Sequence, residues 1–351
     1  MKYMKMFVKK SCPKLLIFAC ISYTMFLLNG CTCNNQKPDI SNINLTINAD
    51  RFERDLFGID VQNAQTGVER LNRKYGNFFN LFSYQVTTLG SKDSIQLVKN
   101  YVSFLSDTNF RNIYTDCETQ FGDFAKYNDE LTSSFRNYAF YFPKKTIPNV
   151  VTLISGFSFP VICDSLTLGI SLDMYLGPTY FYYGTLEPPL PNYLRSRMRK
   201  EFLVCDAMKG WAQSDYGIDE ASARMIDFMI AQGRLIYFLE KILPETEDSI
   251  RTGYTAEQLD WCVANEARIW SFFVENKLMF SIDPNLMNKY VNDGPTTNGF
   301  PQESPGNIGQ FIGWKIVQSY MKNHDELSLQ QLMEQKDLLK IFNESNYKPK
   351  K

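Results

Sequence analysis

The sequence of 351 residues contains a single histidine, His324. Histidine is the most common general base in enzymes and a common protein ligand of catalytic zinc. A Ser-His-Asp or Cys-His site would therefore have to use His324, and an HExxH zinc site cannot be formed. His324 follows a predicted helix, where the helix dipole and the last carbonyl groups favour an imidazole. This position explains His324 without a catalytic role.

Other signatures of catalysis are missing as well. The sequence has no GxxxxGK[ST] phosphate loop, no GxGxxG after a strand and no GxSxG turn. None of its eight cysteines forms a CxxC pair, which disfavours a zinc ribbon. Without its first 30 residues the chain has 32 basic and 38 acidic residues, and this acidic balance disfavours a nucleic-acid partner. We predict no cofactor and no metal site.

The first 30 residues have the pattern of a secretory signal. Five lysines between Lys2 and Lys14 precede the apolar run LLIFACISYTMFLLNG, which is short for a membrane span. The run ends in Leu27-Leu28-Asn29-Gly30-Cys31 and resembles a bacterial lipobox, although an ordinary signal peptide beside a cysteine is the alternative. We predict lipidation of Cys31, a flexible tether over 31–45, and a periplasm-facing protein of the inner or outer membrane.

Residues 46–351 are predicted to form one globular domain. The part 46–149 is mostly helical in pattern. The segments VVTLISGFSFPVI (150–162) and SLTLGISLDMYLG (165–177) then favour paired strands, with Asp164 in the turn. Helical patterns follow Pro191, the first with Asn192 as its cap and the next capped at Asp219. We predict an α+β fold, predominantly helical, with a small antiparallel sheet packed on a helical core.

The segment FPQESPGNIGQFIGWKIVQSYM (300–321) has three glycines where its right half is helical. Each glycine costs about 1 kcal/mol relative to alanine inside a helix. Ser304 suits the N-cap and Pro305 the first helical position. Gly306, Gly309 and Gly313 would then lie near one face, which indicates close approach by another helix or a strand.

Several segments together resemble one known family. They are the lipobox, DMYLGPTYFYYGTLEPPLPNYLRSRM, the helix containing Gly233, FPQESPGNIGQFIGWKIVQSYM and the closing FNESNYKPKK. This set is similar to the gliding-motility-associated lipoproteins called GldB, over nearly all of the mature chain and most clearly over 173–198 and 299–350. The resemblance implies a lipid-anchored cell-envelope protein associated with gliding motility and protein secretion, whose biochemical activity is undefined.

The layout also resembles, more distantly, gluzincin-type zinc peptidases. That likeness places Cys205, Asp206 and Lys209 at the HExxH positions and Gln232 at the position of the third-ligand glutamate. None of the expected ligands is present, and zinc catalysis needs lone-pair donors and a base for the bound water. The resemblance therefore implies a degenerate zincin-like architecture, a pseudo-metallopeptidase without catalytic residues.

We accordingly predict a noncatalytic scaffold that binds a protein or peptide partner of the envelope. We call Tyr180-Phe181-Tyr182-Tyr183 the aromatic loop. This loop and the former active-site cleft supply the candidate contacts Asp173, Tyr180, Tyr182, Tyr183, Arg195, Cys205, Asp206, Lys209 and Gln232. In the simpler interpretation, the aromatic loop only covers the sheet. An enzyme is the alternative function: a weak metal-dependent peptidase or a carboxylate-based cell-wall hydrolase that uses Asp173 and Asp206.

Overall fold

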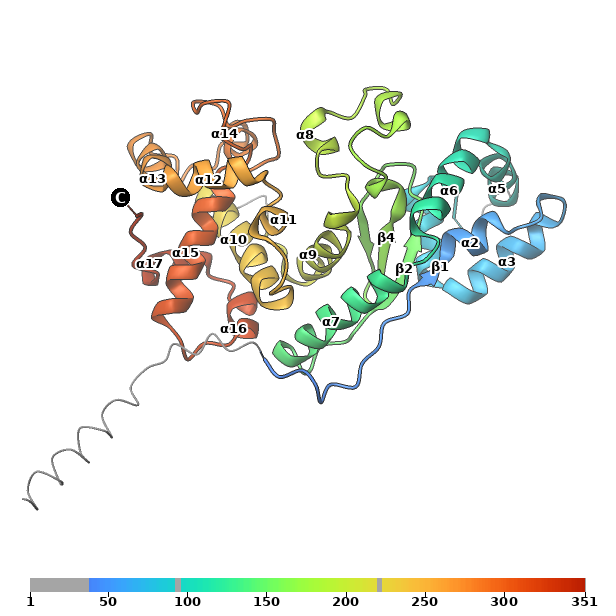
Figure 1. Ribbon diagram of the computed structural model, residues 1–351, viewed down its shortest axis with the longest axis horizontal. Coiled ribbons are helices and arrows are strands. Elements are labelled where there is room, and N and C mark those ends of the chain that lie inside the picture. The colour runs from blue at the N-terminus through green and yellow to red at the C-terminus, as the bar shows by residue number, and fades with distance from the viewer. Residues whose placement is uncertain (1–37, 92–95, 220–222, 351) are drawn as a thin grey trace, which may run out of the picture. The chain divides into compact units, whose positions relative to one another are not determined.

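The computed structural model describes residues 38–91, 96–219 and 223–350. Ile40–Lys351 form one compact unit, which begins with a group of helices (Figure 1). These are α2 (Phe52–Phe57), α3 (Ala64–Tyr75), α4 (Asn77–Asn80), α5 (Leu97–Ser106), α6 (Thr108–Phe121) and α7 (Ala125–Tyr141). Their core is aromatic: the Phe52 ring packs edge to face on Tyr75, Phe78 and Phe82 at centroid distances of 4.8, 5.5 and 4.7 Å.

A four-stranded sheet follows. It consists of β1 (Asp50–Arg51), β2 (Asn149–Leu153), β3 (Val161–Cys163) and β4 (Thr167–Ser171), in the order β1-β2-β4-β3. The predicted helix-dominated α+β class is confirmed. The sheet, however, is mixed and not antiparallel, because β1, β2 and β4 run parallel and only β3 is antiparallel to β4.

The sheet differs from the prediction because the run 150–162 does not form a single strand. Gly156 and Phe157 both adopt positive φ angles, of 69° and 64°, and turn the chain between β2 and β3. The predicted turn at Asp164 is confirmed, since its carboxylate accepts hydrogen bonds from the backbone N–H groups of Leu166 and Thr167, both at 2.8 Å. β3 and β4 form a hairpin, and β2 pairs with the far edge of β4.

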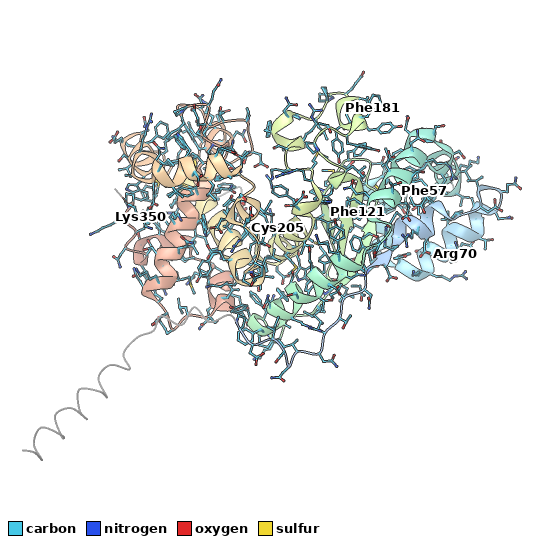
Figure 2. All side chains as sticks on the ribbon, viewed as in Figure 1. Phe57, Arg70, Phe121, Phe181, Cys205 and Lys350 are labelled. Atoms are coloured by element: carbon cyan, nitrogen blue, oxygen red, sulfur yellow. The ribbon has the colours of Figure 1, made fainter. Side chains whose placement is uncertain are left out.

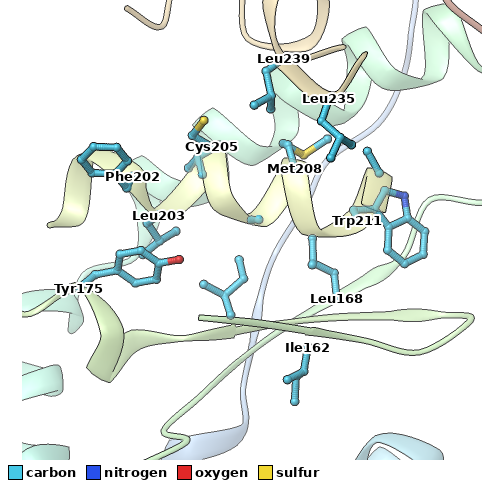
Figure 3. Packing of buried hydrophobic residues seen from close by; sticks show 14 of the residues in the cluster. Ile162, Leu168, Tyr175, Phe202, Leu203, Cys205, Met208, Trp211, Leu235 and Leu239 are labelled. Carbon is cyan, nitrogen blue, oxygen red and sulfur yellow. The ribbon is translucent and has the colours of Figure 1, made fainter. Parts of the chain in front are cut away.

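The helix predicted from Asn192 onward is interrupted. The structure has a short α8 (Asn192–Arg195), a 3₁₀ turn η5 (Lys200–Phe202) and then α9 (Leu203–Tyr216). A backbone bridge between Leu176 and Arg199 holds the intervening chain extended. Figure 3 shows α9 between the sheet, which contributes Leu168, and α10 (Met225–Ile242), which contributes Leu235 and Leu239. α9 therefore occupies the centre of the core.

The glycine-rich segment forms α15 (Gly309–Asn323), and its strongest contact is with α10. A Cβ atom on Gly313 would lie 1.7 Å from the Met229 carbonyl oxygen, and one on Gly233 would lie 2.2 Å from the Gly313 carbonyl carbon. The expected close approach of another helix therefore occurs. The predicted start of this helix is wrong: Ser304 donates to the Pro301 carbonyl at 2.7 Å, and α15 begins five residues later.

The remaining helices follow α10 in the sequence, and they lie around α10 and α15 (Figure 1). They are α11 (Asp248–Thr252), α12 (Ala256–Ala264), α13 (Glu266–Glu275), α14 (Pro284–Tyr290), α16 (Leu329–Glu334) and α17 (Leu338–Glu344). Ser328 caps α16 by accepting a hydrogen bond from Gln331 N–H at 3.2 Å. Over the ranges that the structure describes, none of the helices has the length and apolar character needed to cross a membrane.

Candidate functional site

A cleft of about 880 Å³ lies between three segments that are far apart in the sequence. Residues 192–202 form one wall, residues 247–258 form another, and residues 293–307 close the third side. We call it the α8–α11 cleft. Its lining combines Tyr193, Phe202 and Tyr254 with charged groups of both signs.

Arg197 connects the walls of the α8–α11 cleft. Its Nη1 atom lies 3.2 Å from Oδ2 of Asp293, and its Nη2 atom lies 4.0 Å from Oδ1 of Asp206 on α9. Tyr175 donates a hydrogen bond to Oδ2 of Asp206 at 3.2 Å. Burial raises the pKa of Asp206, whereas the nearby cations Arg197 and Lys209 oppose this shift. The carboxylate is therefore held by an aromatic hydroxyl and a guanidinium.

Two glycines make room for this network. Gly253 has a φ of 73°, and a Cβ atom there would lie 2.8 Å from Cζ of Arg197. A Cβ atom on Gly306 would lie 2.3 Å from the carbonyl oxygen of Gly294, next to Asp293. Gly306 lies before the helix α15. It allows the loop that contains Asp293 to fold tightly, which explains why this position of the segment 300–321 is a glycine.

Cys205 and Lys209 lie one turn apart on α9, beside Asp206. The buried Cys205 thiol donates to the Ile250 carbonyl at 3.7 Å, and burial raises its pKa to about 12. Burial lowers the pKa of Lys209, and Arg197 lowers it further by repulsion. The structure therefore brings together the three residues predicted on this helix, in an environment that favours a protonated thiol.

Gln232 lies elsewhere. It is half-buried on α10 and not on α9. Like Cys205, Asp206 and Lys209, it is not among the described residues that line the α8–α11 cleft. Figure 3 shows Cys205 beside Leu239, which lies seven residues after Gln232 on α10. In the three described ranges no group of three or more His, Cys, Asp or Glu side chains is arranged to hold a metal ion.

Asp173 is completely buried at the end of β4, where it stabilises a loop. Its carboxylate accepts hydrogen bonds from the backbone N–H groups of Ser155 at 3.1 Å and Phe157 at 2.8 Å. Burial raises its pKa to about 6, against the effect of these hydrogen bonds. Tyr183, also fully buried, donates to the Asp173 carbonyl at 2.6 Å. The hydrolase alternative that uses Asp173 is therefore not supported, because this carboxylate has no access to a substrate.

The other tyrosines of the aromatic loop fold back on α6. Tyr180 donates a hydrogen bond to Asp116 at 2.7 Å, and Tyr182 accepts one from Asn112 at 3.1 Å. These contacts agree with the interpretation in which the loop covers the protein core. Phe181 is the exception, because it is 71% exposed and lies at the outer end of the loop (Figure 2).

Arg195 is half-buried on α8 and donates to the side-chain oxygen of Asn192. It is not among the residues that line the α8–α11 cleft, although its neighbour Arg197 is. No sequence pattern indicated Asp293 or Tyr175, which lie 87 residues after and 31 residues before Asp206. Only the fold brings these groups together.

Comparison with protein families identifies the family to which the chain belongs. The family model described as gliding motility protein GldB matches residues 33–349. The chain therefore belongs to the GldB family and is a gliding-motility-associated lipoprotein of the cell envelope. No curated protein and no solved structure matches the chain. The resemblance to gluzincin peptidases thus has no structural support.

Proposed function

We propose that this lipoprotein is noncatalytic and binds an extended segment of an envelope protein in the α8–α11 cleft. The observation that carries the proposal is the cleft itself, with a volume of about 880 Å³ and walls from three distant segments. This volume is within the range of about 300–1,000 Å³ that is typical of ligand sites. Its lining includes tyrosine and arginine side chains, which are types enriched in binding interfaces.

The chemistry next to the cleft supports binding without catalysis. A zinc-bound or nucleophilic cysteine is a thiolate, whereas burial raises the pKa of Cys205 to about 12. The Asp206 carboxylate is already held by Tyr175, and Arg197 lies 4.0 Å away. A guanidinium at this distance repels a divalent cation and competes with a substrate for the carboxylate. We infer a noncatalytic scaffold in which Lys209 stands at one of the positions that the peptidase resemblance assigns to a ligand.

The anchor is proposed at Cys31, which lies outside the described residues. Of the predicted tether, 31–45, the part before Ile40 would link the compact unit to a membrane surface, on the periplasmic side. The secretion machinery associated with gliding is the proposed source of the partner, which would be an envelope protein.

Ala256 offers a test of partner binding, because it is exposed at the first position of α12 and lines the cleft. Ala256→Trp should fill the cleft without disturbing the core. In a gliding strain that lacks this chain, we expect A256W to accumulate normally but not to restore gliding or secretion. Thr108→Trp is the matched control, because Thr108 is exposed at the first position of α6 and away from the cleft. Full restoration by A256W would reject the proposal.

Asp206→Asn separates binding from hydrolysis. The amide oxygen of asparagine can still accept the Tyr175 hydrogen bond, but it cannot serve as a general base or nucleophile. We expect D206N to support gliding and secretion at the wild-type level. Loss of function in a protein that folds and accumulates normally would favour the hydrolase alternative.

A further inference from the structure

A second cavity, of about 920 Å³, lies on another part of the compact unit and shares no lining residue with the α8–α11 cleft. Lys145, the end of α9, the first half of α10 and residues 333–338 line it. We call it the Arg234 cavity. Three side chains from separate elements converge there: Lys145 after α7, Tyr216 at the end of α9, and Arg234 on α10.

Arg234 is a buried guanidinium, only 4% exposed, with unused donors. Its Nη1 atom donates to the carbonyl groups of Leu332, Met333 and Gln335 at 3.4, 3.0 and 2.8 Å, at the end of α16. Among the described residues, Nε has no hydrogen-bond partner, Nη2 donates to no acceptor, and no carboxylate lies within ion-pair distance. The carbonyl groups at the end of α16 therefore account for the hydrogen bonds of Nη1, but they leave the Nε and Nη2 donors of the guanidinium without an acceptor in the part of the chain that the structure describes.

The charge of Arg234 is poorly compensated. Burial lowers its pKa to about 10, which means that the surrounding protein does not replace the lost hydration. Three other cations line the cavity. Lys145 Nζ lies 3.0 Å from Oδ2 of Asp215 and Arg224 Nε lies 2.8 Å from Oδ2 of Asp227, whereas Lys336 is exposed and keeps its hydration. Arg234 is therefore the group that gains most from an added anion.

Tyr216 supplies another unused donor. Its hydroxyl is buried and has no hydrogen-bond partner among the described residues. The ammonium group of Lys145 lies 5.1 Å from the centre of the Tyr216 ring and keeps the ring in place from one side. A buried donor without an acceptor loses the hydrogen bond that water provides in the unfolded chain, so two such groups in one cavity need an explanation.

We propose that the Arg234 cavity binds the carboxylate group of a small molecule or of a peptide C-terminus. The Nε and Nη2 atoms of Arg234 form a planar edge with parallel N–H donors, which matches the two oxygens of a carboxylate. The Tyr216 hydroxyl adds a third donor. A bound carboxylate supplies the missing counter-charge and satisfies the donors left free by the fold.

N-acetylglycine and its neutral analogue N-acetylglycinamide test this site, because they differ only in the carboxylate. The full chain, purified in detergent, is heated with about 20 mM of either compound. We expect N-acetylglycine to raise Tm by a few degrees and the amide to leave it unchanged. Equal effects of the two compounds, or no shift with either, would overturn the proposal.

Two variants assign the effect to the cavity. Tyr216→Phe removes a hydroxyl without a partner in the described structure, so the protein should fold, and the affinity for N-acetylglycine should fall about tenfold. Arg234→Lys keeps one nitrogen for the α16 carbonyl groups but removes the planar edge, and it should abolish the shift. Tyr237→Phe is the control, since Tyr237 lies on α10 outside the residues that line the cavity. Wild-type affinity in Y216F would contradict the assignment.

Discussion

At the scale of single residues, Asp173 stabilises a loop at an electrostatic cost. Its carboxylate holds two backbone N–H groups across the turn at Gly156 and Phe157, where both φ angles are positive. Complete burial nevertheless raises its pKa to about 6, because the desolvation of the charge outweighs these hydrogen bonds. The protonated acid is thus favoured more in the folded protein than in the unfolded chain.

This shift predicts the sign of a pH effect on stability. An unfolded aspartate has a pKa of about 3.9, so between about pH 4 and pH 6 the folded state binds more protons than the unfolded state. The contribution of Asp173 to the free energy of unfolding should therefore fall as pH rises through this window, by about 3 kcal/mol. It should be most favourable below pH 4 and constant above about pH 6.5.

Asp173→Asn isolates this contribution, since the amide does not titrate. Denaturant unfolding of the wild type and D173N at several pH values gives the difference in free energy of unfolding. We expect the wild type to lose stability relative to D173N from pH 4 to pH 7. A difference that stays flat, or rises with pH, would show that Asp173 does not have the raised pKa.

At the scale of elements, the pair α10 and α15 depends on glycine. Gly233 and Gly313 face each other, and Gly313 also faces the Met229 carbonyl oxygen. The two backbones therefore approach so closely that no side chain fits between them. This contact places α10 against α15 on one side and leaves its other side for α9.

Gly313→Ala should reveal how tight this contact is. In an exposed helix the same change stabilises by about 1 kcal/mol, but here the Cβ atom would meet backbone that cannot rotate away. We expect a net loss of about 3 kcal/mol in the free energy of unfolding, measured with denaturant. Gly309→Ala is the graded comparison, because its nearest contact is a Val291 side-chain atom at 2.9 Å. An equal or greater loss in G309A would contradict this packing argument.

The helical patterns predicted most elements but not where the chain breaks. The segment TAEQLDWCVANEARIWSFFVENKLMF has one continuous helical pattern, but it forms two helices, α12 and α13, which meet at Asn265. The helix predicted from Asn192 breaks because the backbone of Arg199 forms a β-bridge with Leu176, which precedes the aromatic loop. Local hydrophobic spacing continues across such positions, whereas the break depends on a tertiary contact that the pattern does not contain.

At the scale of the whole molecule, the same limit applies to the candidate site. The resemblance to gluzincin peptidases implied that Cys205, Asp206 and Lys209 lie together on one helix, and all three lie on α9. Cys205 contacts the Ile250 carbonyl of α11, and Asp206 lies near Arg197, which pairs with Asp293 beyond α14. No local pattern predicts that these segments return to α9. The Arg234 cavity has the same origin, since α10 meets the end of α16 about 100 residues later.

We expect the compact unit, residues 40–351, to contain no stoichiometric zinc when it is purified without chelators or a histidine tag. The Cys205 thiol has a pKa near 12, and Arg197 lies 4.0 Å from the Asp206 carboxylate. Both features oppose a divalent cation. Elemental analysis beside a metal-free control protein measures the content. Near-stoichiometric zinc that disappears in Cys205→Ser would revive the metal-dependent peptidase.

Membrane attachment is a property of the whole chain, and it should depend on one sulfur atom. Each buried CH₂ group of an acyl chain contributes about 0.8 kcal/mol, so stable anchoring needs more than one chain, as a lipidated Cys31 would provide. We expect the wild type to label with a fatty acid and to sediment with membranes, and Cys31→Ser to do neither. Cys33→Ser is a matched control two residues away and should behave as the wild type. Labelling that persists in C31S and disappears in C33S would move the anchor to Cys33, and with it the point at which the tether begins.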